Sequence, residues 1–568
     1  MIHRRNFLHY SFISAGMATL PRHQGHAQNR ATQPVLPRSH MRSLEGMPDR
    51  HVEVWRIPGR FTKNPDIVRF PSGKMMLVFC DVEKHWTEGI SRITTLESLD
   101  GGRKWGNPRV VAQADTSKGE ERWVTPRISL LRDGRLVVIC DHDDFAHYHE
   151  DQAPGNWIWF SSDDGQSWSK PRLIPLPGIE PDRIVELDDG TLMTCATVVH
   201  GDTQKEAMVL MRSKDGTTWT DPTVMAKDHV QNYTEGGIIV LSNGLLACVM
   251  RNENHNGYPS FVVFSTDRGY SWSQPRPLPF CGDRPYGKQL SDGRVLVTYR
   301  NRGGNRGTHA WIGDLTREYG YQIYGTHYDD LVTLDKDALH IHNRSGAVTR
   351  YTLLPPESFR SDAEMETTLK VTGPPDGAIA RMVISRIGVG VEIGASAIWL
   401  RDERSPDRTP RIDEVHKVDM SQDHRIGLYV RKGLVTVKLD GQTVIHRIVR
   451  DEMRLQPTWF GRLADSDGDV WWRNFMYYVR NTTEPDHLWS WQALLGRYPD
   501  QYQLDRMLEV HSNPPLANHG PDNGYSSWVE LPDGRIFMVD YTNRGDPSPT
   551  SHLYGVYFSP EDFQRPTA

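Results

Sequence analysis

The sequence has no hydrophobic run of the length that crosses a membrane, few cysteines and no excess of positive charge. A membrane-spanning helix needs about 20 consecutive apolar residues, so we expect no membrane span. The formal net charge is −6 at pH 7, whereas a protein that binds phosphates needs a concentrated basic surface. Nucleic acid is therefore not an expected partner.

The five cysteines form neither a disulfide framework nor a metal-ligand pattern. Four of them follow a repeated turn, at different distances from its glycine: Cys80, Cys140, Cys195 and Cys248. Because unequal spacing places them in no common layer, we expect small buried side chains there and a loop thiol at Cys281. The acidic segment 465–469 lacks the downstream glutamate of a calcium loop. We predict no required metal and no cofactor.

What the chain does contain is a short turn pattern, Ser-x-Asp-x-Gly-x-x-Trp, repeated four times. The copies are residues 98–105, 161–168, 265–272 and, one residue shorter, 213–219. In such a turn Asp binds its own backbone, Gly tolerates positive φ, and Trp fills the gap between neighbouring sheets. The pattern predicts a hairpin that is used repeatedly.

A second repeat supplies the number of units. An apolar residue, a spacer, a small polar residue and Gly recur at 70–73, 131–134, 187–190, 241–244, 290–293 and 531–534. The first five glycines are 49–61 residues apart, close to the period of a four-stranded propeller blade. The last step, 241 residues, has room for a further domain. We predict an all-β protein, a six-bladed β-propeller with a domain inserted between blades five and six.

The inserted region shows alternating strands, such as residues 434–439 followed by a tight turn. These features resemble a jelly-roll lectin or laminin-G-like β-sandwich, a class that often binds carbohydrate. We expect the following domains: blades one to five at 45–316, the lectin-like sandwich at 317–480, and blade six at 485–568. A strand at 52–57 is expected to complete blade six.

The N-terminus resembles a twin-arginine export signal. Arg4 and Arg5 precede a moderately apolar stretch that ends at Leu20, and residues 25–27 offer a small-residue cleavage site. We expect residues 1–30 to be a signal peptide and the protein to be periplasmic or secreted.

The repeat also locates the residues at the mouth of the central channel, where loops carry function. Six residues before each turn lies one equivalent residue per blade: Asn64, Thr125, Pro181, Glu235, Arg284 and Tyr525. This inner wall is rich in charge, and Arg284 is a candidate for substrate binding.

The repeated turns, which are Asp boxes, resemble the exo-sialidase superfamily over about 45–316 and 485–568, as do Glu235 in blade four and Tyr525 in the last blade. In that family the corresponding Tyr is the nucleophile and the Glu is its base. A neutral phenol with a pKa of about 10 is a poor nucleophile, so a carboxylate in contact must take its proton. The resemblance implies a glycoside hydrolase that releases a terminal acidic sugar, such as sialic acid, from a glycan.

The family also binds the substrate carboxylate with three arginines, whose planar forks match carboxylate oxygens. Arg251 resembles the second of them and Arg306 the third, with Arg300 and Arg302 as alternatives. At the first position this chain has Lys63, a point charge.

The general acid of the family is an Asp in the loop after the second strand of blade one. In this chain that loop contains Glu88, which fits the spacing best. His142 and Asp143 on the adjacent blade are alternatives, and both are candidates for substrate binding.

Two further functions follow from the altered arginine set. The first is a polysaccharide lyase, in which Tyr525 or His142 removes a proton beside a uronate carboxylate neutralised by Arg251 and Lys63. The second is a glycan-binding propeller without catalysis. No oligomeric state is predicted.

Overall fold

The computed structural model describes most of the chain. The residues that it describes are 38–39, 41–83, 85, 89–120, 122–141, 155–229, 231–253, 259–301, 306–317, 323–327, 331–342, 349–353, 361–384, 389–402, 411–448, 458–463, 467–480, 486–514, 522–547 and 550–563. In these residues the regular structure is almost all β-strand, and α1 (Gln501–Arg506) is the one α-helix. Within them, no helix has the length and apolar character that a membrane span requires. The predicted signal peptide at 1–30 lies outside the described residues.

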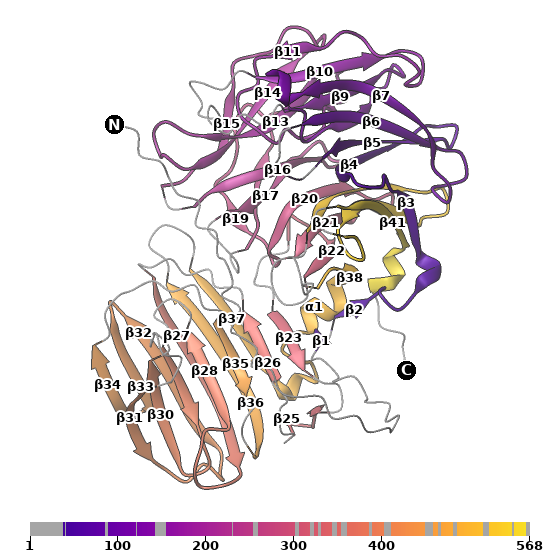
Figure 1. The fold of residues 1–568 in the computed structure, drawn as a ribbon. Helices are drawn as coiled ribbons and strands as arrows, with labels where there is room; N and C mark the ends of the chain where they lie inside the picture. Colours follow the sequence, from indigo (N-terminus) through magenta and orange to yellow (C-terminus); the bar gives the residue numbers. More distant parts are fainter. Residues whose placement is uncertain are drawn as a thin grey trace, which may run out of the picture. The chain divides into compact units, whose positions relative to one another are not determined.

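Four sheets of four antiparallel strands follow one another along the chain (Figure 1). Their strands are β4 (Phe61–Arg69), β5 (Met75–Val82), β6 (Ile90–Ser98) and β7 (Gly106–Asp115); β8 (Arg127–Leu130), β9 (Leu136–Cys140), β10 (Asn156–Ser161) and β11 (Arg172–Ile174); β12 (Val185–Glu186), β13 (Leu192–Val199), β14 (Glu206–Ser213) and β15 (Thr223–Ala226); and β16 (Tyr233–Val240), β17 (Leu246–Asn252), β18 (Phe261–Ser265) and β19 (Arg276–Pro277). In each sheet neighbours in sequence are neighbours in space, as in the blades of a β-propeller.

Two further small sheets are completed by strands from distant parts of the chain. The fifth contains β20 (Gly282–Gln289), β21 (Val295–Asn301) and β22 (Gly307–Gly313), then β38 (Met507–Ser512) and β2 (Arg42–Ser43). The last contains β39 (Asn523–Glu530), β40 (Ile536–Thr542) and β41 (His552–Phe558), with β3 (His51–Trp55) paired to β41. The predicted strand at 52–57 therefore does complete the last sheet, and indigo β3 lies beside yellow β41 in Figure 1.

The small sheets pack on one another in a cyclic order. Each neighbouring pair contributes to one buried apolar cluster, represented in turn by Val78 and Val138, Ile139 and Val209, Met208 and Cys248, Val249 and Val297, Leu296 and Met538, and Val539 and Leu77. The last cluster joins the last sheet to the first. The strands between two such clusters are buried on both faces.

The chain between β22 and β38, together with the short strand β1 near the N-terminus, forms two eight-stranded sheets, here called the eight-stranded pair. One sheet contains β1 (Arg38–Ser39), β23 (Ile323–His327), β26 (Thr349–Leu353), β35 (Thr458–Arg462), β28 (Ala380–Ile384), β29 (Val389–Ile393), β30 (Ala397–Asp402) and β31 (Arg411–Lys417). The other contains β24 (Val332–Leu334), β25 (Leu339–Ile341), β36 (Asp469–Arg480), β27 (Asp362–Thr372), β32 (His424–Arg431), β33 (Leu434–Leu439), β34 (Gln442–Ile448) and β37 (His487–Gln492). Both sheets contribute to a single apolar cluster.

The inserted segment begins and ends at a different place from the one predicted, which was between blades five and six. β22 and β38 are hydrogen-bonded neighbours, so the intervening chain is inserted within the fifth sheet rather than after it. The segment 485–568 is divided accordingly: β37 pairs with β36, β38 with β22, and only β39–β41 belong to the last sheet. The blade repeat did not reveal this, because β38 carries no copy of it.

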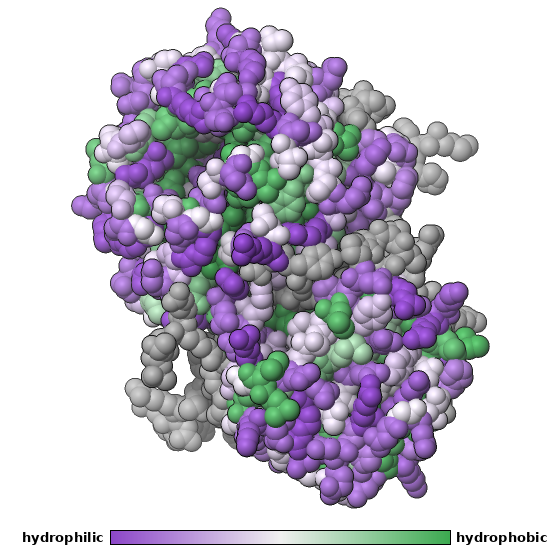
Figure 2. All heavy atoms as spheres, turned by 180° about the vertical axis from the view of Figure 1, so that it is seen from behind, coloured by the Kyte–Doolittle hydropathy of each residue, from purple (hydrophilic) through white to green (hydrophobic). Residues whose placement is uncertain are grey.

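One face of the surface is mostly hydrophilic, and the cysteines are buried with the apolar residues. Hydrophilic residues predominate on the face shown in Figure 2, and the hydrophobic residues there form small groups. All five cysteines are buried and none forms a disulfide, which matches the prediction for four of them; Cys281, expected in a loop, is buried as well.

Candidate active site

Four inner strands of the small sheets contain the same backbone irregularity. The pairing shifts register after Lys63 in β4, Thr234 in β16, Asp283 in β20 and Gly524 in β39. The next residue in each strand has a positive φ: Asn64 (54°), Glu235 (51°), Arg284 (44°) and Tyr525 (63°). Non-glycine residues rarely adopt this conformation, and it is held only where the surroundings enforce it. These are four of the six positions that the repeat picked out.

The third sheet follows the same rule with a displacement of one residue. The repeat position there is Pro181, whose ring fixes φ at about −65°. The positive φ (56°) falls instead on the preceding residue, Glu180. The repeat count does not point to Glu180 for this reason, and the proline at the repeat position is the one signal of it in the sequence.

The side chains of Glu180 and Glu235 meet at the phenol of Tyr525. Its hydroxyl oxygen lies 2.8 Å from Oε1 of Glu180 and 3.1 Å from Oε1 of Glu235. Glu235 is 1% exposed, and its Oε2 accepts a hydrogen bond of 2.8 Å from the backbone N–H of Arg284. The structure thus brings together Tyr525 and Glu235, which the sequence placed on different blades, and adds a second carboxyl group.

The two carboxyl groups differ in charge. Burial opposes the ionisation of Glu235, but the nearby guanidinium groups, of which Arg251 contributes most, outweigh it and lower its pKa to about 2. Burial, and then the negative charge of Glu235, raise the pKa of Glu180 to about 8. Burial also raises the pKa of Tyr525 well above its usual value. At neutral pH the phenol therefore lies between the ionised carboxyl group of Glu235, to which its hydroxyl donates, and the protonated carboxyl group of Glu180.

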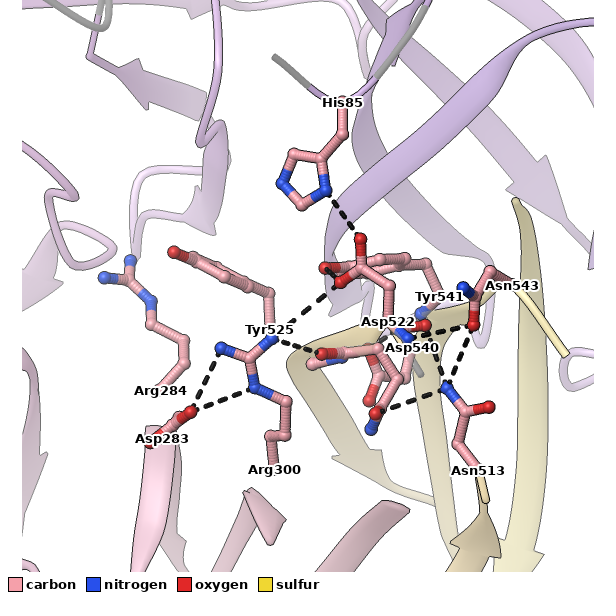
Figure 3. A network of polar contacts seen from close by, with 12 residues as sticks. His85, Asp283, Arg284, Arg300, Asn513, Asp522, Tyr525, Asp540, Tyr541 and Asn543 are labelled. Carbon is pink, nitrogen blue, oxygen red and sulfur yellow. Dashed lines mark hydrogen bonds and ion pairs between the residues drawn. The ribbon is translucent and has the colours of Figure 1, made fainter. Parts of the chain in front are cut away.

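Two predicted arginines face this site, and both contact Asp283. Arg251 Nε lies 2.9 Å from Asp283, its NH1 lies 3.1 Å from Glu235, and it also contacts Glu253. Arg300 contacts Asp283 at 3.0 Å and donates 2.9 Å to the carbonyl of Asn523 (Figure 3). The guanidinium groups are therefore fixed by acidic partners, a feature that the sequence pattern did not indicate.

The remaining cationic candidates lie in different surroundings. Lys63 is buried and lines the cavity, and burial lowers its pKa. Arg284 is buried and donates to the backbone carbonyls of Glu180 and Pro181, at 2.9 and 2.7 Å, so it holds the site rather than facing its open space. Arg306 is exposed and is not among the described residues that line the cavity.

A further part of the cavity is lined by His85 and Tyr541, which both contact Asp522. His85 Nδ1 lies 2.6 Å from Oδ2 of Asp522, and the hydroxyl of Tyr541 donates 2.8 Å to Oδ1 of the same carboxylate (Figure 3). Burial lowers the pKa of His85. His85 belongs to the loop in which the general acid was predicted. Glu88, His142 and Asp143 themselves lie outside the described residues.

These residues surround a cavity of about 250 Å³. Its lining includes Lys63, Asn64, His85, Thr125, Asp141, Glu180, Glu235, Arg251, Arg300, Tyr525 and Tyr541. The Asp-box turns are not among the lining residues: in each, the Ser hydroxyl accepts from the Gly N–H and the Asp carboxylate accepts from the following backbone, as at Ser161, Asp163 and Gly165. They are structural turns.

A family model and several solved structures are similar to parts of this chain. Residues 105–308 match the family model of the BNR repeat-like domain, and no curated protein matches the chain. A protein of unknown function from Dyadobacter fermentans has 19% identity and a TM-score of 0.40 over 54% of this chain and 94% of its own. Trypanosoma rangeli sialidase is 12% identical, with a TM-score of 0.37, and the match covers 78% of this chain and 95% of the sialidase. The complex of that sialidase with 2,3-difluorosialic acid is also 12% identical, with a TM-score of 0.39, and the match covers 76% of this chain and 94% of the sialidase.

The family match covers the second to the fourth small sheets and part of the fifth, and this segment carries three of the four Asp boxes. With its repeated turns and its all-β sheets, the segment 105–308 is similar to a BNR repeat-like domain.

Proposed function

We propose that this protein is an exo-acting glycoside hydrolase of the sialidase type, which releases a terminal acidic sugar from a glycan. The observation that carries the proposal is the phenol of Tyr525 held between Glu180 and Glu235 at 2.8 and 3.1 Å. A phenol in a buried cavity is made reactive only by a base in contact, and Glu235 is ionised and within reach of its proton.

The reaction has two steps. In the first, the oxygen of Tyr525 attacks the anomeric carbon as Glu235 takes the phenolic proton, and the glycosidic C–O bond breaks. The leaving oxygen takes a proton from the general acid, for which Glu88 remains our candidate. In the second, water attacks the anomeric carbon and gives a proton to the general acid, which lost its own in the first step, while the Tyr525 oxygen leaves and recovers its proton from Glu235. The sugar keeps its anomeric configuration.

Glu180 has a separate role in this scheme. Because its carboxyl group is protonated at neutral pH, it donates a hydrogen bond to the phenol oxygen and leaves Glu235 as the single base. The same hydrogen bond stabilises the phenolate that departs in the second step. Glu180 therefore orients the lone pair of Tyr525 and favours its release.

The substrate class follows from the cavity. Lys63, Arg251 and Arg300 line it beside the phenol, and guanidinium forks bind carboxylates. At about 250 Å³ the cavity is slightly smaller than typical ligand sites, which span roughly 300–1,000 Å³. This size favours one terminal sugar ring over an internal segment. A polysaccharide lyase, in which the same cations would neutralise the carboxylate of a uronate during elimination, remains the second candidate function.

Product analysis on a panel of chromogenic sialosides and uronides tests the proposal. Hydrolysis gives a new reducing sugar without ultraviolet absorbance, whereas elimination gives an unsaturated product that absorbs. We expect hydrolysis, abolished in Tyr525→Phe and retained in Tyr286→Phe. Tyr286 is a matched control because it is a buried inner-strand tyrosine whose hydroxyl has no hydrogen-bond partner among the described residues. An absorbing product, or binding without any product, would reject the hydrolase.

We also propose the domain organisation and the location predicted from sequence. The cyclic packing of the small sheets supports a six-bladed propeller, and the single cluster shared by the eight-stranded pair supports an inserted β-sandwich. Cleavage after a twin-arginine signal at residues 1–30 would deliver a folded protein to the periplasm or the medium. N-terminal sequencing of the exported protein tests this, and a chain that retains residues 1–30 would contradict it.

A further inference from the structure

The eight-stranded pair carries a group of metal-ligating side chains that has no part in the proposed catalysis. β25 and β36 pair antiparallel, with His340 opposite Trp471 and Ile341 opposite Val470. Ile341 and Val470 are fully buried in the apolar cluster. Because side chains alternate along a strand, His340, His342, Asp469 and Trp471 share the opposite face.

The ligand atoms on this face converge. One ligand atom from each of His340, His342 and Asp469 lies within 4.8 Å of the other two. Nε2 of His340 is 3.8 Å from Oδ1 of Asp469, and the two imidazole rings are 3.8 Å apart between centroids.

Neighbouring side chains hold the two rings in place. The ring of His340 stacks on Trp471, with centroids 4.2 Å apart and planes at 16°. Nε2 of His342 lies 3.2 Å from the hydroxyl of Thr333. Both imidazoles are therefore positioned by contacts outside the group, as second-shell contacts position ligands in metal sites.

Hydrogen bonding within the group does not account for this arrangement. A separation of 3.8 Å is too long for an N–H···O hydrogen bond, and the buried Nε2 of His340 has no hydrogen-bond partner among the described residues. Buried polar atoms are rarely left without a partner. A cation between the imidazoles and the carboxylate would satisfy this nitrogen.

The charges around His340 permit a metal. Burial, followed by repulsion from His342, lowers the pKa of His340, while Asp469 and Asp335 oppose this and Lys370 adds to it. The Lys370 ammonium lies over Trp471, 4.7 Å from the ring centroid, on the side where β27 pairs with β36.

We propose that His340, His342 and Asp469 bind a divalent first-row transition ion of the zinc class. Two imidazole nitrogens and one carboxylate oxygen are typical zinc ligands, whereas calcium takes six to eight oxygens. Three protein ligands leave a fourth position for water. The ion joins β25 to the start of β36 and so fastens one edge of the sheet. This site differs from the calcium loop considered at 465–469, with which it shares Asp469, and it is independent of the proposed hydrolase.

Calorimetric titration of the full chain, stripped with a chelator, tests the site directly. With ZnCl₂ we expect one zinc ion per chain that CaCl₂ does not displace, and at least tenfold weaker binding in His342→Ala and in Asp469→Asn. His446→Ala is the matched control, because His446 is an exposed histidine on β34 outside the group. Equal zinc binding by the wild type and both variants would overturn the proposal.

A second readout separates metal binding from damage to the fold. For each protein the melting temperature is measured with and without zinc, so that every variant has its own metal-free baseline. Zinc should raise the melting temperature of the wild type and of His446→Ala and leave that of His342→Ala and Asp469→Asn unchanged. A zinc-dependent rise of equal size in all four proteins would place the ion elsewhere and reject the site.

Discussion

The inner strands of the small sheets and the strands of the eight-stranded pair place polar residues in different ways. In β27 exposure alternates along eleven residues, and its polar side chains apart from Thr367 are partly exposed. In β4, eight of nine residues are buried, including Thr62, Lys63, Asn64 and Asp66. A buried polar group must find a partner or destabilise the fold. Polar residues in the inner strands are therefore fixed by specific contacts, and those at the cavity are placed for chemistry.

Backbone geometry shows the same contrast. In the eight-stranded pair, the described non-glycine residues with positive φ are Lys432 and Asp440, which lie in turns between strands. In the small sheets such residues also occur inside inner strands, at Asn64, Glu235 and Tyr525 among others. Bulges of this kind redirect a side chain next to a site. In the small sheets the irregular pairing comes with a positive φ at the residue that faces the site, whereas register shifts in the eight-stranded pair, such as that between Thr368 and Leu369, occur without one.

The largest effect on kcat/KM is expected at Glu235, an inner-strand residue. Glu235→Gln keeps the size of the side chain and removes the base, so kcat/KM should fall by on the order of 10²–10⁴-fold. Glu364→Gln on β27, a partly exposed carboxylate paired with Arg431 at 3.3 Å, is the control and should leave kcat/KM unchanged. Steady-state kinetics of the two variants provide the check, and equal losses would refute the contrast.

Glu180 should govern the alkaline limit of activity. Its pKa is raised to about 8, so kcat/KM should fall as the pH rises through 8 and the carboxyl group loses its proton. In Glu180→Gln this limb should disappear, because the amide does not titrate. A pH profile of both proteins decides the matter: an unchanged alkaline limb in the variant would assign the titration to another group.

The same group makes folding stability depend on pH. Since the folded pKa of Glu180 lies above its usual value of 4.5, its stabilising contribution is complete below about pH 4.5 and is lost as the pH rises through 8. Relative to the wild type, Glu180→Gln should therefore gain stability between acidic and alkaline pH. Denaturant unfolding at pH 5 and pH 9 measures the difference; a constant offset would contradict the shifted pKa.

Removing a buried carboxylate should lower the free energy of unfolding more than removing an exposed one. Asp66 is fully buried and accepts hydrogen bonds from the N–H groups of Ile67 and Ile128, which joins the first sheet to the second. Asp66→Ala leaves both donors without a partner and should cost about 2–4 kcal/mol. Glu364→Ala should cost under about 1 kcal/mol. Similar losses in urea titrations would show that burial is not the deciding factor.

The smallest effect is expected at an Asp-box tryptophan. Trp168 packs against the cluster between the first and second sheets and is not among the residues lining the cavity. Trp168→Ala should lower the free energy of unfolding by about 1–3 kcal/mol and leave the activity per folded molecule intact. Loss of that specific activity would mean that the Asp-box turns take part in the site.

Much of this arrangement could be predicted from the repeats. Counting from the turn glycines located Glu235 and Tyr525, because a fixed spacing within each hairpin carries over from blade to blade. The count failed at Glu180, where Pro181 displaces the bulge by one residue. It also gave no indication of Asp283, because partners on neighbouring strands leave no spacing in the sequence. The position of the insertion was missed because β38 lacks the repeat.

The most direct test of the account is to identify the residue that bonds to the sugar. A slowly hydrolysed fluorinated glycoside of the preferred acidic sugar is incubated with the protein, which is then quenched, digested and analysed by peptide mass spectrometry. We predict one sugar per chain, attached to the peptide that contains Tyr525 and absent from Tyr525→Phe. An adduct on any other residue, or continued hydrolysis by Tyr525→Phe, would contradict the role of the phenol between its two carboxyl groups.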